Sequence, residues 1–154
     1  MRFRVSDLKR TINKNKKSPL CLTIPIPPSV NKIHYTDRKG VRRLTSHSEN
    51  YIRATRIYLK QAIAEQQFEM RDDDTWYYLD LVFKFPDRRT RDSHNCLKIL
   101  MDALEGYCFK NDYFVMPRIQ AVEYDKKDPC VIMVLSEQTE EERAKYLHLV
   151  HKQV

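Results

Sequence analysis

Residues 88–112 read RRTRDSHNCLKILMDALEGYCFKND, and the rest of the chain is interpreted outward from this stretch. A basic run leads into Asp92, and the residues that follow have the spacing of an amphipathic helix. Apolar positions recur at i, i+3, i+4 and i+7, which predicts one buried helix face. These positions are Leu97, Leu100, Met101 and Leu104. Asp92 is placed to cap the start of this helix, and Gly106 to end it.

The remaining side of this predicted helix is polar and carries Asn95, Lys98 and Asp102. Asp102 follows Lys98 by four residues, a spacing at which the two side chains pair. We expect Asp112 to fold back toward the end of the helix that Asp92 caps. Carboxylates, water and phosphate oxygens are the usual ligands of Mg²⁺. The pattern therefore favours a divalent-metal site for a phosphate ester; the alternative is a set of solvated helix charges with Asp92 only a cap.

Two segments resemble the RusA family of Holliday-junction resolvases, which is common in phages and prophages. The motif D-x-x-N-x-x-K-x-x-x-D-A-L-x-G begins at Asp92 and is followed by Asn111-Asp112. Residues 24–31, IPIPPSVN, resemble the opening strand and turn of the family. The resemblance spans residues 22–135, most of the chain. It implies Mg²⁺-dependent hydrolysis of phosphodiester bonds in branched DNA by a homodimer.

Carried over residue by residue, the resemblance implies that Asp92 and Asp112 are two of three metal-binding aspartates and that Lys98 is the active-site lysine. His94 stands where the third aspartate is expected. Imidazole suits Mn²⁺ better than Mg²⁺. His94 is thus a metal ligand, a general base, or the mark of a weakened enzyme. We name Asp92, His94, Asp112 and Lys98 as catalytic and the first three as metal ligands, with Mg²⁺ as the cofactor and Mn²⁺ as its alternative.

Basic residues near this stretch and in the loop over residues 31–45 are candidates for contact with DNA. The net charge of +7 favours an anionic partner, although charge alone does not identify it. Cations on either side of a cleavage site hold the phosphate backbone, and an aromatic among them can meet a base. The predicted DNA-binding residues are Arg88, Arg89, Arg91, Asn95, Lys32, Arg42 and Arg43.

The length of 154 residues and a hydrophobic content of 42% suit one globular domain. We assign residues 1–18 to a basic arm and residues 19–154 to a single domain; the arm either follows phosphates or is a solvated tail. Apolar runs are too short for a membrane span. The four cysteines form no C-x-x-C pair and are interpreted as reduced. We therefore expect no membrane partner and a cytoplasmic location, in a bacterium or a phage-infected host cell.

The remaining elements follow from patterning. We predict an edge strand at 20–26, a turn at 37–40, and a helix from Ser46 to about Phe68 that begins with a Ser46–Glu49 capping box. Alternation predicts a strand at 76–85. Strands at 118–124 and 130–135 are expected to form an antiparallel hairpin, and a final helix to run from Thr139 to about Lys152. This order favours an α+β fold, a mixed β-sheet with helices packed on it.

These observations predict a metal-dependent endodeoxyribonuclease that resolves four-way junctions and other branched DNA as a homodimer. One alternative is a junction-binding protein whose catalysis is weakened, with His94 as the sign of that loss. Another is a structure-specific nuclease for flaps or single strands.

Overall fold

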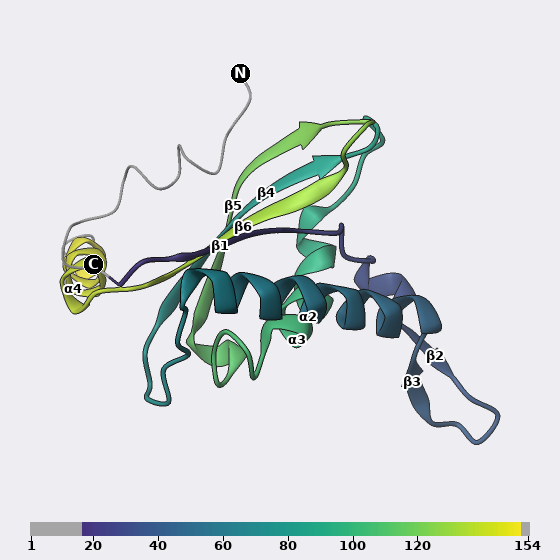
Figure 1. Cartoon of the computed structure of the whole chain (residues 1–154), viewed down its shortest axis with the longest axis horizontal. Helices are drawn as coiled ribbons and strands as arrows, with labels where there is room; N and C mark the ends of the chain where they lie inside the picture. Colours follow the sequence, from purple (N-terminus) through teal and green to yellow (C-terminus); the bar gives the residue numbers. More distant parts are fainter. Residues whose placement is uncertain (1–16, 152–154) are drawn as a thin grey trace.

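The computed structural model describes residues 17–151, apart from four side chains near the end of the final helix. Of the basic arm expected at residues 1–18, all but the last two residues lie outside the described part of the chain. The fold is α+β: a four-stranded sheet, a separate two-stranded hairpin, two helices packed against the sheet, and a final helix that lies beyond the end of the last strand (Figure 1).

The sheet has the strand order β1-β6-β4-β5. Its strands are β1 (Leu20–Ile24), β4 (Tyr77–Phe85), β5 (Val115–Tyr124) and β6 (Cys130–Glu137). β4 runs parallel to β5 and antiparallel to β6, and β1 runs antiparallel to β6. The sheet is therefore mixed, as the sequence predicted, and β1 is an edge strand.

The expected hairpin of β5 with β6 is wrong, because β4 lies between them. Tyr77, Leu79, Leu81, Phe83 and Phe85 are all buried in the main core, while Tyr78 and Val82 are buried on the opposite face of β4. A strand that is apolar on both faces gains most from a central position. The link after β5 still turns at Asp125, whose carboxylate accepts the amides of Lys127 and Asp128, but it crosses over β4.

Helix α2 (Ser46–Gln66) and helix α3 (Leu97–Leu104) contact each other and pack on the same face of the sheet (Figure 1). Leu59 and Ala62 of α2 join Leu100 and Leu104 of α3 in the main core. Arg56 of α2 donates to the carbonyl oxygens of residues 102 and 103, at 3.2 and 3.3 Å. These bonds satisfy carbonyls at the end of α3 that have no partner within the helix.

The start of α2 corrects one prediction. Thr45, not Ser46, is the N-cap, because its hydroxyl accepts the amide of Ser48 at 3.3 Å. On this helix Tyr51, Thr55 and Leu59 are buried, whereas Tyr58 is 50% exposed. Gln67 ends the helix in the left-handed conformation, with φ of 51°.

A hairpin of β2 (His34–Thr36) and β3 (Arg42–Leu44) projects from the body of the molecule beside the start of α2 (Figure 1). Its turn is fixed by Asp37, whose Oδ1 accepts the amides of Lys39 and Val41, both at 2.9 Å. Gly40 supplies the positive φ, 79°, that the turn requires. The sequence predicted the turn but not the strands, which are short and largely polar.

Two features complete the fold. Helix α4 (Glu140–His151) begins with a capping box, in which Thr139 and Glu142 exchange side-chain to amide bonds at 3.0 and 3.2 Å. Pro117 lies within β5, where the absence of an amide hydrogen is tolerated because β5 is an edge strand. Among the described residues, no helix has the length and apolar content needed to cross a bilayer.

Candidate functional site

Asp92 begins the site, at the entrance to α3. It is the N-cap of a 3₁₀ turn, η2 (Ser93–Cys96), that leads directly into α3. Its Oδ1 accepts the amide of His94 at 3.0 Å and lies 3.3 Å from the ring Nδ1 of the same residue. Both side chains are open to solvent, with relative exposures of 57% for Asp92 and 77% for His94. Asp92 therefore caps the 3₁₀ turn rather than α3 itself, whose N-cap is Cys96, and the structure brings Asp92 and His94 together.

Lys98 lies one turn further along and pairs with Asp102, as predicted, at 2.6 Å between Nζ and Oδ1. The hydrogen bond to Asp102 raises the pKa of the Lys98 ammonium, and the charges of Asp102, Asp112 and Glu105 act in the same direction, against a smaller opposing effect of burial. Lys98 thus remains cationic through neutral and mildly alkaline pH. It also lies within electrostatic reach of Asp112.

Asp112 opens a second 3₁₀ turn, η3 (Asp112–Phe114), immediately before β5. Asn111 caps this turn by accepting the amide of Tyr113 at 2.8 Å. Because β4 and β5 are parallel, Val115 at the start of β5 pairs with Tyr77 at the start of β4. Asp92, in contrast, follows the far end of β4. Asp112 nevertheless acts electrostatically on Lys98 of α3, so the expectation that it folds back toward the start of this helix stays a prediction.

A metal site would require these side chains to be grouped closely. Among the described residues, no three His, Cys, Asp or Glu side chains are grouped closely enough to hold an ion. Asp92 and His94 offer one carboxylate and one imidazole at the start of η2, and Asp112 offers a second carboxylate immediately before β5. The carboxylates fit a hard divalent cation, whereas the imidazole suits Mn²⁺ better than Mg²⁺. The three residues named from the sequence do not form such a group among the described residues.

The basic lead-in, Arg88, Arg89 and Arg91, precedes Asp92. Asp87 forms ion pairs with two of these residues, Arg89 and Arg91. Arg91 forms a two-pronged ion pair with Asp87, at 2.6 and 2.9 Å, and its guanidinium lies 5.2 Å from the ring centre of Phe85. Hydrogen bonds from the Arg91 side chain and from the Arg89 amide lower the pKa of Asp87 to about 2. Arg88 lies over the ring of Tyr124 at 5.5 Å. Arg89 is 83% exposed and lies 3.8 Å from Asp87.

A hollow of about 500 Å³ connects these residues. It joins Asp92 and Asn95 to Arg91 and Lys32, so the fold brings four of the residues predicted from sequence to one place. The hollow is also lined by Ile26, Pro27, Ser29, Phe85, Pro86, Thr90 and Cys96. Segment 24–31 thus forms one wall of the site, which explains why its sequence accompanies the helix motif.

Cys96 is a lining residue that the sequence interpretation did not assign to the site. It is 6% exposed, and its Sγ donates to the carbonyl of Pro27 at 3.4 Å, which ties η2 to that wall. Burial raises the pKa of the Cys96 thiol, and the charge of Asp92 adds to this effect. None of the four cysteines is in a disulfide, and all four are buried.

Arg42 and Arg43 do not line this hollow, because they lie on the projecting hairpin. Arg43 pairs with Asp37 at 2.6 Å, and Arg42 lies 3.3 Å from the ring Nδ1 of His34. Both remain exposed.

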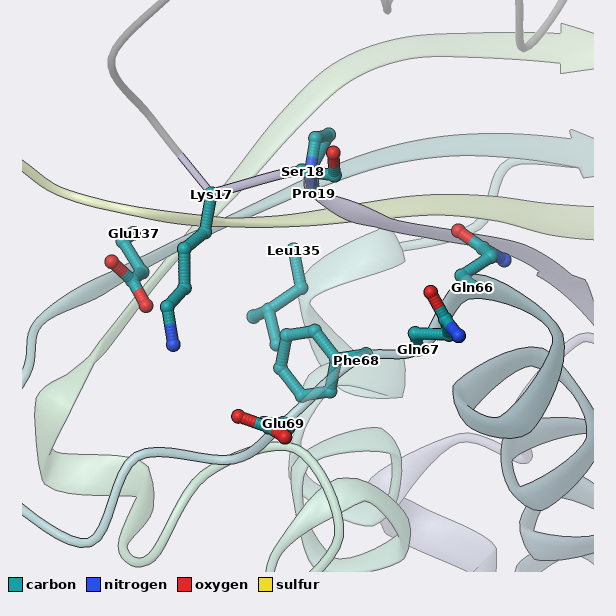
Figure 2. A pocket seen from close by; sticks show the side chains of 9 residues that line it. All are labelled: Lys17, Ser18, Pro19, Gln66, Gln67, Phe68, Glu69, Leu135 and Glu137. Carbon is teal, nitrogen blue, oxygen red and sulfur yellow. The ribbon is translucent and has the colours of Figure 1, made fainter.

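A second hollow, of about 530 Å³, lies between the start of β1 and the ends of α2 and β6 (Figure 2). Lys17 and Glu137 are on one side of it, Gln66 and Gln67 on the other, with Phe68 and Leu135 between them (Figure 2). Since Leu20 pairs with Leu135, this hollow belongs to the end of the sheet opposite to Asp92. It shares no lining residue with the candidate site.

The protein is thus an α+β protein with a mixed sheet, and its hollow combines a solvent-facing carboxylate with an arginine and a lysine. Side chains of these types can bind a phosphate ester and hold a metal ion beside it. Residues 25–135 match the family model described as Endodeoxyribonuclease RusA. The match covers most of the chain, so the protein belongs to the RusA endodeoxyribonuclease family. A comparison with curated proteins found no match.

Proposed function

We propose that the protein is an endonuclease that hydrolyses phosphodiester bonds in branched DNA, with the four-way junction as its substrate. Family membership supports the activity class. The observation that carries the proposal is the hollow that joins Asp92 and Asn95 to Arg91 and Lys32. A carboxylate flanked by cations is arranged to receive a polyanionic strand and to act on one of its phosphates.

The residues of the chain then have separate tasks. Arg91, fixed by Asp87, and Lys32 hold the backbone, and Arg88 and Arg89 extend this contact along the strand. Arg42 and Arg43 reach DNA from the hairpin. Asn95 orients a ligand or a water molecule. Lys98 supplies a permanent positive charge that offsets negative charge developing on the phosphate.

A divalent cation, Mg²⁺ or Mn²⁺, is part of this proposal. When bound, such an ion activates water and stabilises charge on the phosphate. Asp92 and His94 are the residues proposed to hold it from one copy of the chain. His94 adds a nitrogen donor that suits Mn²⁺ better than Mg²⁺.

We further propose that the chain acts as a homodimer, and that the second copy supplies Asp112 to complete the metal site. A two-fold dimer also matches a junction in which two strands are cut. Mixing Asp92→Asn protein with Asp112→Asn protein tests this arrangement. Mixed dimers regain one intact site, and nick one strand, only if the two carboxylates come from different copies. Failure of mixing to restore nicking, with exchange of subunits verified, would place both carboxylates in one copy.

The decisive experiment is incubation of a synthetic four-way junction with Mg²⁺, with Mn²⁺, and with a chelator. We expect paired strand cuts with at least one metal and none with the chelator. Binding without cleavage in any metal would favour the alternative of a junction-binding protein with weakened catalysis. This alternative is supported by the absence, among the described residues, of a group of three potential metal ligands.

A panel of labelled flaps, single strands and duplexes addresses the alternative of a nuclease with another specificity. Preference for the junction supports the proposal, and preference for a flap or a single strand contradicts it. We place this activity in the cytoplasm of a bacterial or phage-infected cell, which accords with four free, buried cysteines.

A further inference from the structure

Tyr113, directly after Asp112, has no part in the function proposed so far. It is 69% exposed, more than any other large hydrophobic side chain in the described part of the chain. Such exposure leaves apolar surface in water, which is unfavourable unless a partner covers it. The position of Tyr113 beside a carboxylate assigned to the site suggests that this partner is the substrate.

The ring of Tyr113 is held in place from behind. Its amide donates to Asn111 at 2.8 Å, which fixes the η3 turn. The ring centre lies 5.4 Å from Trp76, tilted by 52°, and 5.1 Å from Phe114, nearly perpendicular at 87°. Trp76 and Phe114 also contact each other at 5.4 Å. Neither neighbour stacks in parallel on Tyr113, so the cluster supports the ring without covering it.

Several aromatic rings of the described residues have a cation over them, and Tyr113 is not one of these. Arginines lie over the rings of Trp76, Tyr107 and Tyr124, at 5.0, 5.3 and 5.5 Å. Within residues 17–151, no such cation lies over Tyr113. Its neighbour Lys110 is directed elsewhere, 3.7 Å from Asp72. A rigidly mounted aromatic face that is open to solvent fits a flat, uncharged ligand better than a phosphate.

We propose that Tyr113 is a stacking platform for a nucleobase that is unpaired or unstacked at the branch point. This inference rests on the proposed function, because it assumes that a DNA strand passes Asp112. A branch interrupts base stacking, and an aromatic face can replace a lost neighbour with little dependence on sequence. Tyr113 thus recognises the branch, while the arginines hold the backbone.

The test combines protein and DNA changes in a chelator, so that binding is measured without cleavage. Junction affinity is measured for wild type, Tyr113→Phe, Tyr113→Ala and the control Tyr58→Ala, which removes another half-exposed tyrosine, on α2. Each protein is titrated with an intact junction, with a junction whose central bases are replaced by abasic sites, and with a continuous duplex. Trp76, the only tryptophan in the chain, reports on the same site by its fluorescence.

We expect Tyr113→Ala to bind the intact junction roughly tenfold more weakly, with Tyr113→Phe and Tyr58→Ala close to wild type. The wild-type protein should bind the abasic junction more weakly than the intact junction by a similar factor. Tyr113→Ala should bind the two junctions with nearly equal affinity, because the base and the ring contribute to affinity only together. The junction, but not the duplex, should change Trp76 emission in the wild-type protein, a readout that requires no substitution.

Three results would overturn the inference: equal loss of affinity for junction and duplex in Tyr113→Ala, equal sensitivity of wild type and Tyr113→Ala to the abasic sites, or unchanged Trp76 emission at saturating junction. A shift of Tyr113→Ala to a lower mass than wild type would also overturn it, because the ring would then be covered by a second copy. If wild-type protein binds no junction at all, the proposed function fails first, so the two failures are distinguishable.

Discussion

Asp92 has a structural role and a proposed chemical role, and one substitution separates them. Asp92→Asn retains an oxygen that can accept the amide of His94, so the cap of η2 should persist. It removes the negative charge, so cleavage should fall by more than about a hundredfold while junction affinity stays the same. Asp112→Asn should behave alike. Gel assays of cleavage and binding measure both effects.

The control for these variants is Asp74→Asn, which neutralises an exposed carboxylate near the other end of β4. It should cleave as wild type does. Normal turnover in Asp92→Asn or Asp112→Asn would remove that residue from the site.

His94 should determine which metal is preferred. Wild type is expected to cleave faster with Mn²⁺ than with Mg²⁺, and His94→Asp should shift the preference toward Mg²⁺, because a carboxylate offers oxygen in place of nitrogen. His47→Ala, at an exposed histidine on α2, is the matched control. Rates are compared across pH 6–9, where the raised pKa of Lys98 keeps its charge constant. If His94→Ala matches wild type with both ions throughout, His94 has no chemical part.

Among the elements, α3 is the support of the site. Leu100 is fully buried between α2 and the sheet, and Leu100→Ala should lower the free energy of unfolding by about 2–5 kcal/mol. Denaturant unfolding followed by circular dichroism measures this loss. Leu147→Ala, at a side chain 51% exposed on α4, should change stability little. Equal effects of the two substitutions would contradict the placement of α3 in the core.

The basic lead-in should account for part of the salt dependence of binding. Replacing both Arg88 and Arg89 by alanine should reduce the slope of log affinity against log salt by about 2, since each phosphate contact contributes about one unit. Lys145→Ala on α4 is the control and should leave the slope unchanged. An unaltered slope in the double variant would mean that these arginines do not touch the backbone.

Arg91 is left intact in that experiment because it is committed to Asp87. The pKa of Asp87 is lowered to about 2 by Arg91, so the pair is complete above the ordinary carboxyl range and is lost only as the pH falls toward 2. Titrations between pH 5 and pH 8 therefore compare variants with the same charge at this pair.

Single elements were predictable from the sequence where burial has a simple period. The spacing of Leu97, Leu100 and Leu104 gave α3, and alternation gave β4. Pairing was not predictable in the same way. The short link between β5 and β6 indicated a hairpin, but the decisive quantity was the burial of both faces of β4, which only the assembled sheet reveals. The β2–β3 hairpin was missed because its strands carry no apolar alternation.

The site was predictable in part for a related reason. Asp92, Asn95 and Arg91 are near in sequence, and the structure brings them together with Lys32. Asp112 lies at the other end of a parallel β4–β5 pair, and the direction of that pairing is not encoded in local spacing. Cys96 was overlooked because an apolar thiol within a helix pattern resembles an ordinary core residue.

At the scale of the whole molecule, the chain should be a dimer in solution. Light scattering at micromolar concentration should give twice the chain mass of 18.5 kDa, with and without junction DNA. The physical reason is that the described residues of one copy contain no group of three potential metal ligands, so the proposed site needs a second copy. A monomer under both conditions would contradict the dimer and the shared site together.

Pro117 affects how readily the sheet can associate with strands of other chains. The outer edge of β5 has no neighbouring strand among the described residues, and such an edge can recruit strands from other chains into open-ended aggregates. Proline carries no amide hydrogen, so it interrupts the row of donors that an incoming strand would need. Pro117 therefore makes the β5 edge a poorer template for an incoming strand than an unbroken row of amides would be.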